Sequence, residues 1–103
     1  MYKLCFYVPE NAMELVKNAL FEIGAGKMGE YDSCCWQTPG TGQFRPLENS
    51  NPYIGLKGRI ETVAEFKVEM VCEDKHIIAA IDALKKAHPY EEPAFDVWKL
   101  EDL

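Results

Sequence analysis

The sequence predicts an α+β fold with four strands and two helices in the order β-α-β-β-α-β. Two segments place apolar residues three and four positions apart, which is typical of helices that bury one face. The segments before, between and after them are short and mostly rich in β-branched and aromatic residues. Because each helix has a single apolar stripe, both should cover the same face of an antiparallel sheet. This is the ferredoxin-like arrangement, and 103 residues suffice for one such domain, residues 1–103.

The first half of the chain predicts one strand and one helix. Residues 2–8, "YKLCFYV", have the composition of a short buried strand. Pro9 and Glu10 suit the first turn of a helix, where a missing N–H costs little and an acid complements the dipole. Gly24 is placed to end this helix in a left-handed conformation. The expected apolar stripe consists of Ala12, Leu15, Val16, Ala19, Leu20 and Ile23.

The rest of the chain predicts three strands and the second helix. Residues 30–38 are expected to form the second strand and residues 94–100 the fourth, whose buried face the pattern leaves open. The third strand is the clearest, because apolar residues alternate with mostly charged ones. Its apolar face is Ala64, Phe66, Val68, Met70 and Cys72. Asp74 is expected to cap the second helix, which buries Ile77, Ala80, Ile81, Leu84 and Ala87 and ends at His88–Pro89.

Residues 39–58 predict a long loop between the second and third strands. A hairpin needs about two to five residues there, so a loop of this length usually has a function. Glycines such as Gly40 and Gly42 would let the chain leave the second strand through unusual backbone angles. We expect the loop to pack on the body or on a neighbouring subunit and to contact a ligand or partner. The residues expected to take part are Gly40, Gly42, Phe44, Pro46, Asn51, Pro52, Ile54, Gly55 and Gly58, with Tyr90 from a later segment.

Composition excludes several kinds of partner. Seventeen acidic against eleven basic residues give a net charge of −6, which repels nucleic acid and anionic membranes.

No apolar run is long enough for a transmembrane segment, and the expected location is the cytoplasm. The four cysteines include no C-x-x-C pair, so a zinc ribbon has no support and free thiols are expected.

The segment "HPYEEP", residues 88–93, concentrates titratable groups between two prolines. One hypothesis is a divalent-metal site, for zinc or copper, in which His88 acts with Glu91 or Glu92. The other is an architectural corner, in which Tyr90 buries its ring and hydrogen-bonds through its hydroxyl while a glutamate accepts backbone N–H groups. Catalysis is the weakest alternative, because no nucleophile is spaced for a triad with either histidine.

Three motifs resemble one known family. They are "GTGQFRP" (40–46), "NPYIGLKGRIETVAEFKVE" (51–69) and "AHPYEEPAFDV" (87–97). Together they are similar to the domain inserted in the YqfO-type, Nif-three-like dinuclear-metal proteins, which has the fold of the PII and CutA proteins. The resemblance implies a PII/CutA-like trimer and a loop that contacts effectors or partners. The metal-binding domains of the longer relatives are not part of the matching motifs, so their chemistry is not implied here.

From these observations we expect a non-enzymatic trimeric module that binds a small ligand or a protein partner at clefts between subunits, with no cofactor required. The alternative is a divalent-metal-binding protein centred on His88. A hydrolase-type enzyme is the weaker third possibility.

Overall fold

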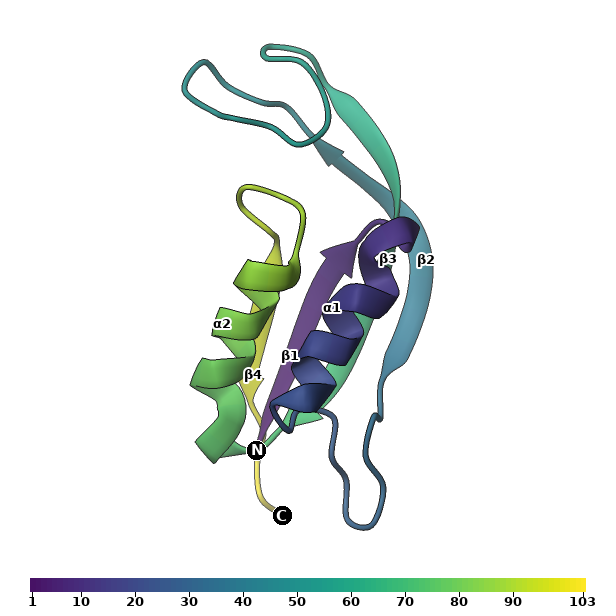
Figure 1. Cartoon of the computed structure of the whole chain (residues 1–103), viewed down its shortest axis with the longest axis vertical. Coiled ribbons are helices and arrows are strands. Elements are labelled where there is room, and N and C mark those ends of the chain that lie inside the picture. Colours follow the sequence, from purple (N-terminus) through teal and green to yellow (C-terminus); the bar gives the residue numbers. More distant parts are fainter.

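The computed structural model describes residues 1–103 and shows a four-stranded antiparallel sheet with both helices on one face (Figure 1). The elements are β1 (Tyr2–Val8), α1 (Glu10–Glu22), β2 (Trp36–Phe44), β3 (Glu61–Cys72), a 3-10 turn (Asp74–His76), α2 (Ile77–Ala87) and β4 (Phe95–Lys99). The strands lie in the order β2-β3-β1-β4. The predicted ferredoxin-like α+β fold is confirmed. Neither helix is long and apolar enough to cross a lipid bilayer.

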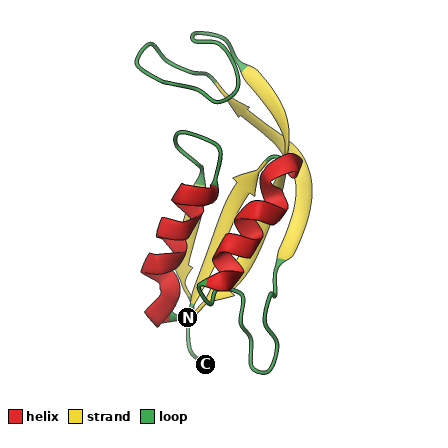
Figure 2. Cartoon of the chain, in the orientation of Figure 1, coloured by secondary structure: helices red, strands yellow, loops and turns green.

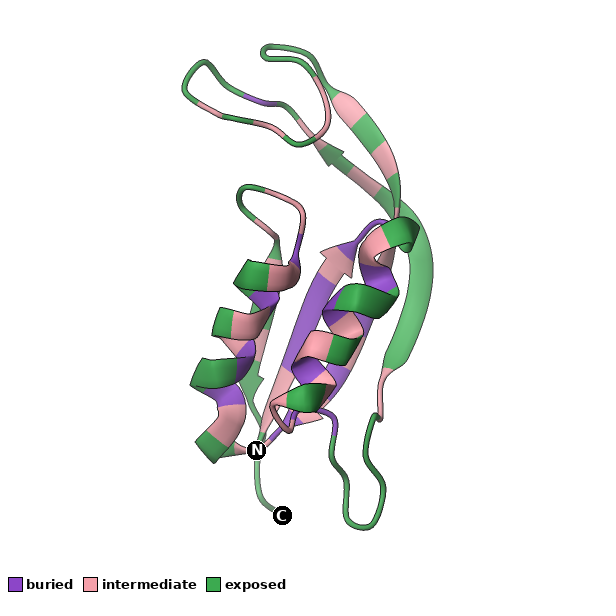
Figure 3. Ribbon diagram, in the orientation of Figure 1, coloured by how far each residue is buried: buried purple, intermediate pink, exposed green.

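The hydrophobic core lies between the sheet and the helices (Figure 3). Leu4, Phe6 and Val8 of β1 alternate toward this layer, as the period of a strand requires. The prediction for Leu15 is wrong, because its side chain is 65% exposed. Met13 takes its place in the core, and Leu15, two positions later, points to the other side of the helix. The buried residues of the core are Leu4, Phe6, Val8, Met13, Val16, Leu20, Ala25, Val68, Met70, Cys72, Ile77, Ala80 and Leu84.

The buried face of β4, which the sequence left open, is the one that carries Phe95 and Val97. Both side chains pack against the core. Their neighbours in the strand, Asp96 and Trp98, therefore point to the face that the helices do not cover.

The second strand is displaced from its predicted position. It runs from Trp36 to Phe44, not over residues 30–38, and so includes the proline and glycines that predicted a loop. β2 is an edge strand, and a proline such as Pro39 is tolerated there because one side of the strand has no neighbour to bond. Gly40 and Gly42 do not have positive φ angles, so their predicted role in an unusual backbone turn is also wrong.

The β2–β3 hairpin gives the molecule its elongated shape, with extents of 46 × 25 × 24 Å. The hairpin extends beyond the helices (Figure 2). The predicted loop over residues 39–58 is shortened to residues 45–60, and this segment lies beside the turn between α2 and β4 (Figure 1). Within it Gly55 and Gly58 have φ angles of +94° and +80°, which glycine adopts without strain.

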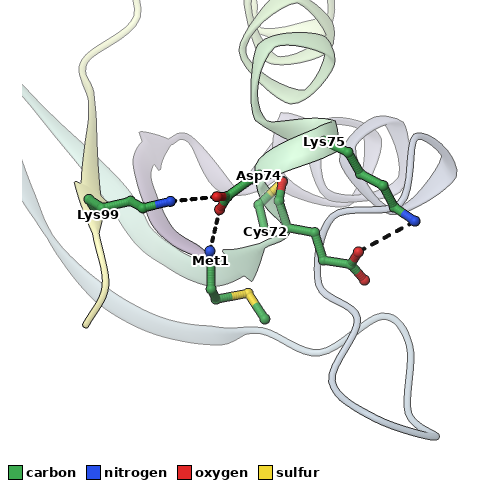
Figure 4. Close-up of polar contacts among 6 residues, drawn as sticks. Met1, Cys72, Asp74, Lys75 and Lys99 are labelled. Atoms are coloured by element: carbon green, nitrogen blue, oxygen red, sulfur yellow. Dashed lines mark hydrogen bonds and ion pairs between the residues drawn. The ribbon is translucent and has the colours of Figure 1, made fainter. Parts of the chain in front are cut away.

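Asp74 does not cap α2 as predicted. The carboxylate of Asp74 accepts hydrogen bonds from the amino group of Met1 and from Nζ of Lys99 (Figure 4). These contacts lower the pKa of Asp74 to about 2. The side chain therefore links the first strand and the last strand to the start of the second helix.

Gly24 and Gly40 offer a matched test of where glycine is required. Gly24 has a φ of +101°, and a Cβ there would meet the ring of His76 at 2.8 Å. We expect Gly24→Ala to lower the free energy of unfolding by about 1 kcal/mol or more. Gly40 has open space and no positive φ, so Gly40→Ala should leave stability nearly unchanged. Urea denaturation of both variants measures this, and equal losses would contradict the account.

Candidate ligand-binding groove

A groove of about 1410 Å³ lies between the β2–β3 hairpin and the turn from α2 to β4. Glu65, Lys67 and Glu69 line it from β3, on the face of the sheet that the helices do not cover. The loop after Phe44 and residues 90–92 form its other walls. Segments that are far apart in the sequence thus meet around one space.

Most of the predicted ligand or partner residues line this groove. Those that do are Gly40, Gly42, Phe44, Pro46, Pro52, Ile54 and Tyr90. Asn51, Gly55 and Gly58 are not part of the lining. The backbone N–H of Asn51 instead donates a 2.9 Å hydrogen bond to Oε1 of Glu91, which ties the loop to the corner at residues 88–92. The binding role of all these residues stays a prediction.

Aromatic rings from three segments gather around Tyr90. The ring centroids of Phe44 and Tyr53 lie 6.3 Å and 6.1 Å from that of Tyr90, in tilted arrangements. The ring of His88 lies 4.8 Å from it. Such pairs are worth about 0.5–1.5 kcal/mol beyond the area they bury. The cluster therefore helps to hold the hairpin loop against the corner.

His88 is buried, and backbone groups occupy both nitrogens of its ring. Nε2 lies 2.7 Å from the carbonyl oxygen of Tyr7, and Nδ1 accepts a 3.1 Å hydrogen bond from the N–H of Tyr90. The two contacts require the neutral tautomer with its proton on Nε2. Burial lowers the pKa of His88 below its ordinary value, although the bond to Tyr7 opposes the shift.

These hydrogen bonds bear on the metal hypothesis. A metal ion at His88 would have to displace either the bond to Tyr7 or the bond to Tyr90. Glu91 and Glu92 are both exposed, and Glu91 already accepts the N–H of Asn51. No three histidine, cysteine, aspartate or glutamate side chains are grouped closely enough to hold a metal ion. Metal binding by His88 with Glu91 or Glu92 stays a prediction that would need a rearranged corner or a second subunit.

The hydroxyl of Tyr90 departs from the architectural hypothesis. It is buried with no partner within hydrogen-bonding distance, where a hydrogen bond was expected. Burial raises the pKa of Tyr90, and the nearby Glu65 carboxylate raises it further. The hydroxyl is therefore neutral at physiological pH and enclosed beside Glu65.

Sequence reasoning missed the contribution of β3 and β1 to the groove. Glu65, Lys67 and Glu69 belong to the mostly charged face of the third strand, and such a face is ordinarily solvated. Tyr7 also lines the groove, from the odd-numbered side of β1. The signal that would have found them is the alternation of side chains along each strand. It places these residues on the same face of the sheet as Gly40 and Gly42 of β2.

Known proteins similar in sequence are longer than this chain. It is 46% identical over 98 residues to the GTP cyclohydrolase 1 type 2 homolog of Mycobacterium leprae, a match that covers 95% of this chain and 26% of that protein. The Bacillus subtilis protein of the same name is 42% identical over 99 residues, 96% of this chain and 26% of that protein. The chain thus spans about a quarter of the length of these relatives. No protein-family model matches it.

Solved structures agree with the sequence matches. A Bacillus cereus protein related to NIF3 superimposes with a TM-score of 0.84 at 36% identity, covering 98% of this chain and 26% of that one. The chain is thus similar in sequence and structure to one part of this longer NIF3-related protein. CutA from Xylella fastidiosa superimposes with a TM-score of 0.71 at 22% identity, covering 98% of this chain and 84% of its own. The chain therefore has a CutA-like fold, as its motifs indicated.

The depressed pKa of His88 predicts how the stability of this chain depends on pH. Its ordinary pKa is 6.5, so on acidification the unfolded chain binds a proton before the folded chain does. Stability should therefore be full above about pH 6.5 and fall as the pH drops below it. His88→Gln keeps an N–H donor for the Tyr7 carbonyl but cannot be protonated in this range.

Thermal melts of both proteins between about pH 7 and about pH 5 measure the effect. The melting temperature of the wild type should fall more steeply than that of His88→Gln. Asp74 does not interfere, because its stabilisation is lost only as the pH falls below 3.8. Parallel curves for the two proteins would contradict a buried neutral His88.

Proposed function

We propose that this chain is a non-catalytic binding module that assembles as a homotrimer and takes a small ligand or a protein partner in the groove, at clefts between subunits. The observation that carries the proposal is the groove itself, which is built from segments that the fold and two specific tethers hold together. Those tethers are the His88 contacts to Tyr7 and Tyr90 and the Asn51–Glu91 hydrogen bond.

The uncovered face of the sheet supports an assembled state. Trp36 and Trp98 are 68% and 48% exposed on this face. By register Trp36 is opposite Glu69, and Trp98 is opposite Lys3, which is itself opposite Val71. Large exposed aromatic residues on one face are typical of surfaces that bind another protein chain. A second copy would cover them, and the groove on the same face would then open at the boundary between copies.

The sheet edges support closure into a ring. β2 and β4 are the two edge strands, so one copy can present a free edge of each kind. Contact between unlike edges is heterologous, and it yields a closed ring when the rotation between copies closes. Similarity of fold to CutA proteins and the resemblance to PII proteins favour three copies, as an analogy of fold.

The non-catalytic part of the proposal is supported by how the histidine nearest the groove is used. Both nitrogens of His88 bond to backbone groups, so neither is paired with a nucleophile. The relatives bear the name of a cyclohydrolase homolog, but this chain corresponds to about a quarter of their length. An activity of the whole relatives is therefore no part of the proposal.

Divalent-metal binding through His88 with Glu91 or Glu92 is the alternative. One structure of the same fold is titled the periplasmic divalent cation tolerance protein CutA of Archaeoglobus fulgidus. At 19% identity that likeness concerns the fold. The hydrogen bonds of His88 make this alternative weaker than the groove.

Light scattering in dilute solution tests the assembly. We expect a particle with about three times the chain mass of 11.7 kDa. Trp36→Lys should reduce the particle mass without unfolding the chain, because Trp36 contributes nothing to the core. Leu15→Lys is the matched control, since Leu15 is similarly exposed on the helical side. A monomer for the wild type, or equal effects of both variants, would refute the assembly.

A further inference from the structure

We infer that the groove recognises a small organic cation, one that carries an ammonium or guanidinium group on an alkyl chain. The inference rests on the proposed function, because it specifies the ligand class for the same groove. Its basis is the combination of a carboxylate without a cationic partner, a hydroxyl beside that carboxylate and three aromatic rings in one space.

Glu65 supplies the carboxylate. Its side chain extends across β2 beside Gly42, where a Cβ on the glycine would collide with the carboxyl group. Glycine at position 42 thus leaves the room that Glu65 occupies. No lysine, arginine or amino terminus forms an ion pair with Glu65 within 4.0 Å. The carboxylate is therefore available to a cation that enters the groove.

Tyr90 supplies the second polar group. Its hydroxyl oxygen is buried and forms no hydrogen bond of ordinary geometry, and the group it interacts with is the Glu65 carboxylate. The Glu65 carboxylate lies near it. An ammonium or guanidinium group carries several N–H donors, so it can bond to the Glu65 carboxylate, on which the neighbouring Tyr90 hydroxyl also acts. A carboxylate or phosphate ligand would instead be repelled by Glu65.

The aromatic rings favour an organic cation over a metal ion. The rings of Phe44 and Tyr53 both lie beside that of Tyr90, at centroid distances of 6.3 Å and 6.1 Å. A cation over such a ring face is attracted by the negative charge of the π-system, and more strongly when water is excluded. A hard metal ion needs several oxygen ligands, whereas the chain groups no three acidic, histidine or cysteine side chains for one.

The charges around the groove agree with this ligand class. The lining contains five acidic residues and two basic ones: Glu48, Glu65, Glu69, Glu91 and Glu92 against Arg45 and Lys67. Lys67 lies two residues after Glu65 on the same face of β3. It pairs in register with Tyr7 of β1 and Thr38 of β2. The net charge of the lining is thus negative, and it attracts cations on average.

Calorimetric titration of the assembled wild-type protein with agmatine, which carries both an ammonium and a guanidinium group, tests the inference. We expect saturable binding that weakens as salt is added, because the contact is ionic. 1,4-Butanediol, a neutral chain of similar length, should not bind. Citrate, an anion, should not bind either.

Three variants locate the binding. Glu65→Gln should weaken agmatine about tenfold or more, and Tyr90→Phe should weaken it less while leaving thermal stability intact. Glu101→Gln removes the same charge from the exposed C-terminal segment, outside the groove, and should have no effect. Equal losses in Glu65→Gln and Glu101→Gln would overturn the inference, because binding would then reflect net charge alone.

The remaining outcomes separate this inference from the proposed function. If agmatine does not bind and citrate binds saturably, the inferred preference for a cation is wrong, while the proposed binding function of the groove stands. Absence of binding by any probe would overturn the inference, while light scattering tests the assembly independently. A smaller particle in Glu65→Gln with unchanged agmatine affinity would also overturn it, because Glu65 would then serve a subunit contact.

Discussion

The two hydrogen bonds of the His88 imidazole fix the relation between the core and the groove. His88 comes directly after α2, and its ring bridges the carbonyl of Tyr7 at the end of β1 and the N–H of Tyr90 in the corner. It is the one charged or strongly polar residue among the buried side chains. A buried imidazole is tolerated because both nitrogens are satisfied and the ring is neutral. Removing it would leave a backbone carbonyl and a backbone N–H without partners.

The groove depends on this bridge. With Tyr90 held by His88, the rings of Phe44 and Tyr53 have a fixed surface to pack against, and the tip of the β2–β3 hairpin stays beside the corner. The Asn51–Glu91 hydrogen bond provides a second tie between the same two segments. Both ties lie outside the main core, which is complete without the hairpin tip. Substitutions in the hairpin loop should therefore leave the fold intact but alter the shape of the groove.

The sequence predicted the elements that depend on interactions between residues close in the chain. It did not predict contacts between residues far apart in the chain. Helix periodicity predicted the buried faces of α2 and most of α1, and alternation predicted β3. The pattern failed at Pro39, because a proline is acceptable in a strand only if that strand lies at an edge, which is a property of the whole sheet. It failed at Asp74 because its partners, Met1 and Lys99, come from both ends of the chain. The hydrogen bond between His88 and Tyr7 could not be predicted from the sequence. Tyr7 is 81 residues away and contributes a backbone oxygen, which side-chain patterns do not indicate.

The most direct test of this account is the protonation state of His88. Long-range ¹⁵N–¹H correlation spectra report the two ring nitrogens separately in the folded protein. At about pH 7 we predict a neutral ring with its proton on Nε2, and Nδ1 shifted as a hydrogen-bond acceptor. Tyr90→Pro, which removes the N–H that Nδ1 accepts, should change the Nδ1 signal most. A charged imidazolium, or a proton on Nδ1, at that pH would contradict the bridge and the groove built on it.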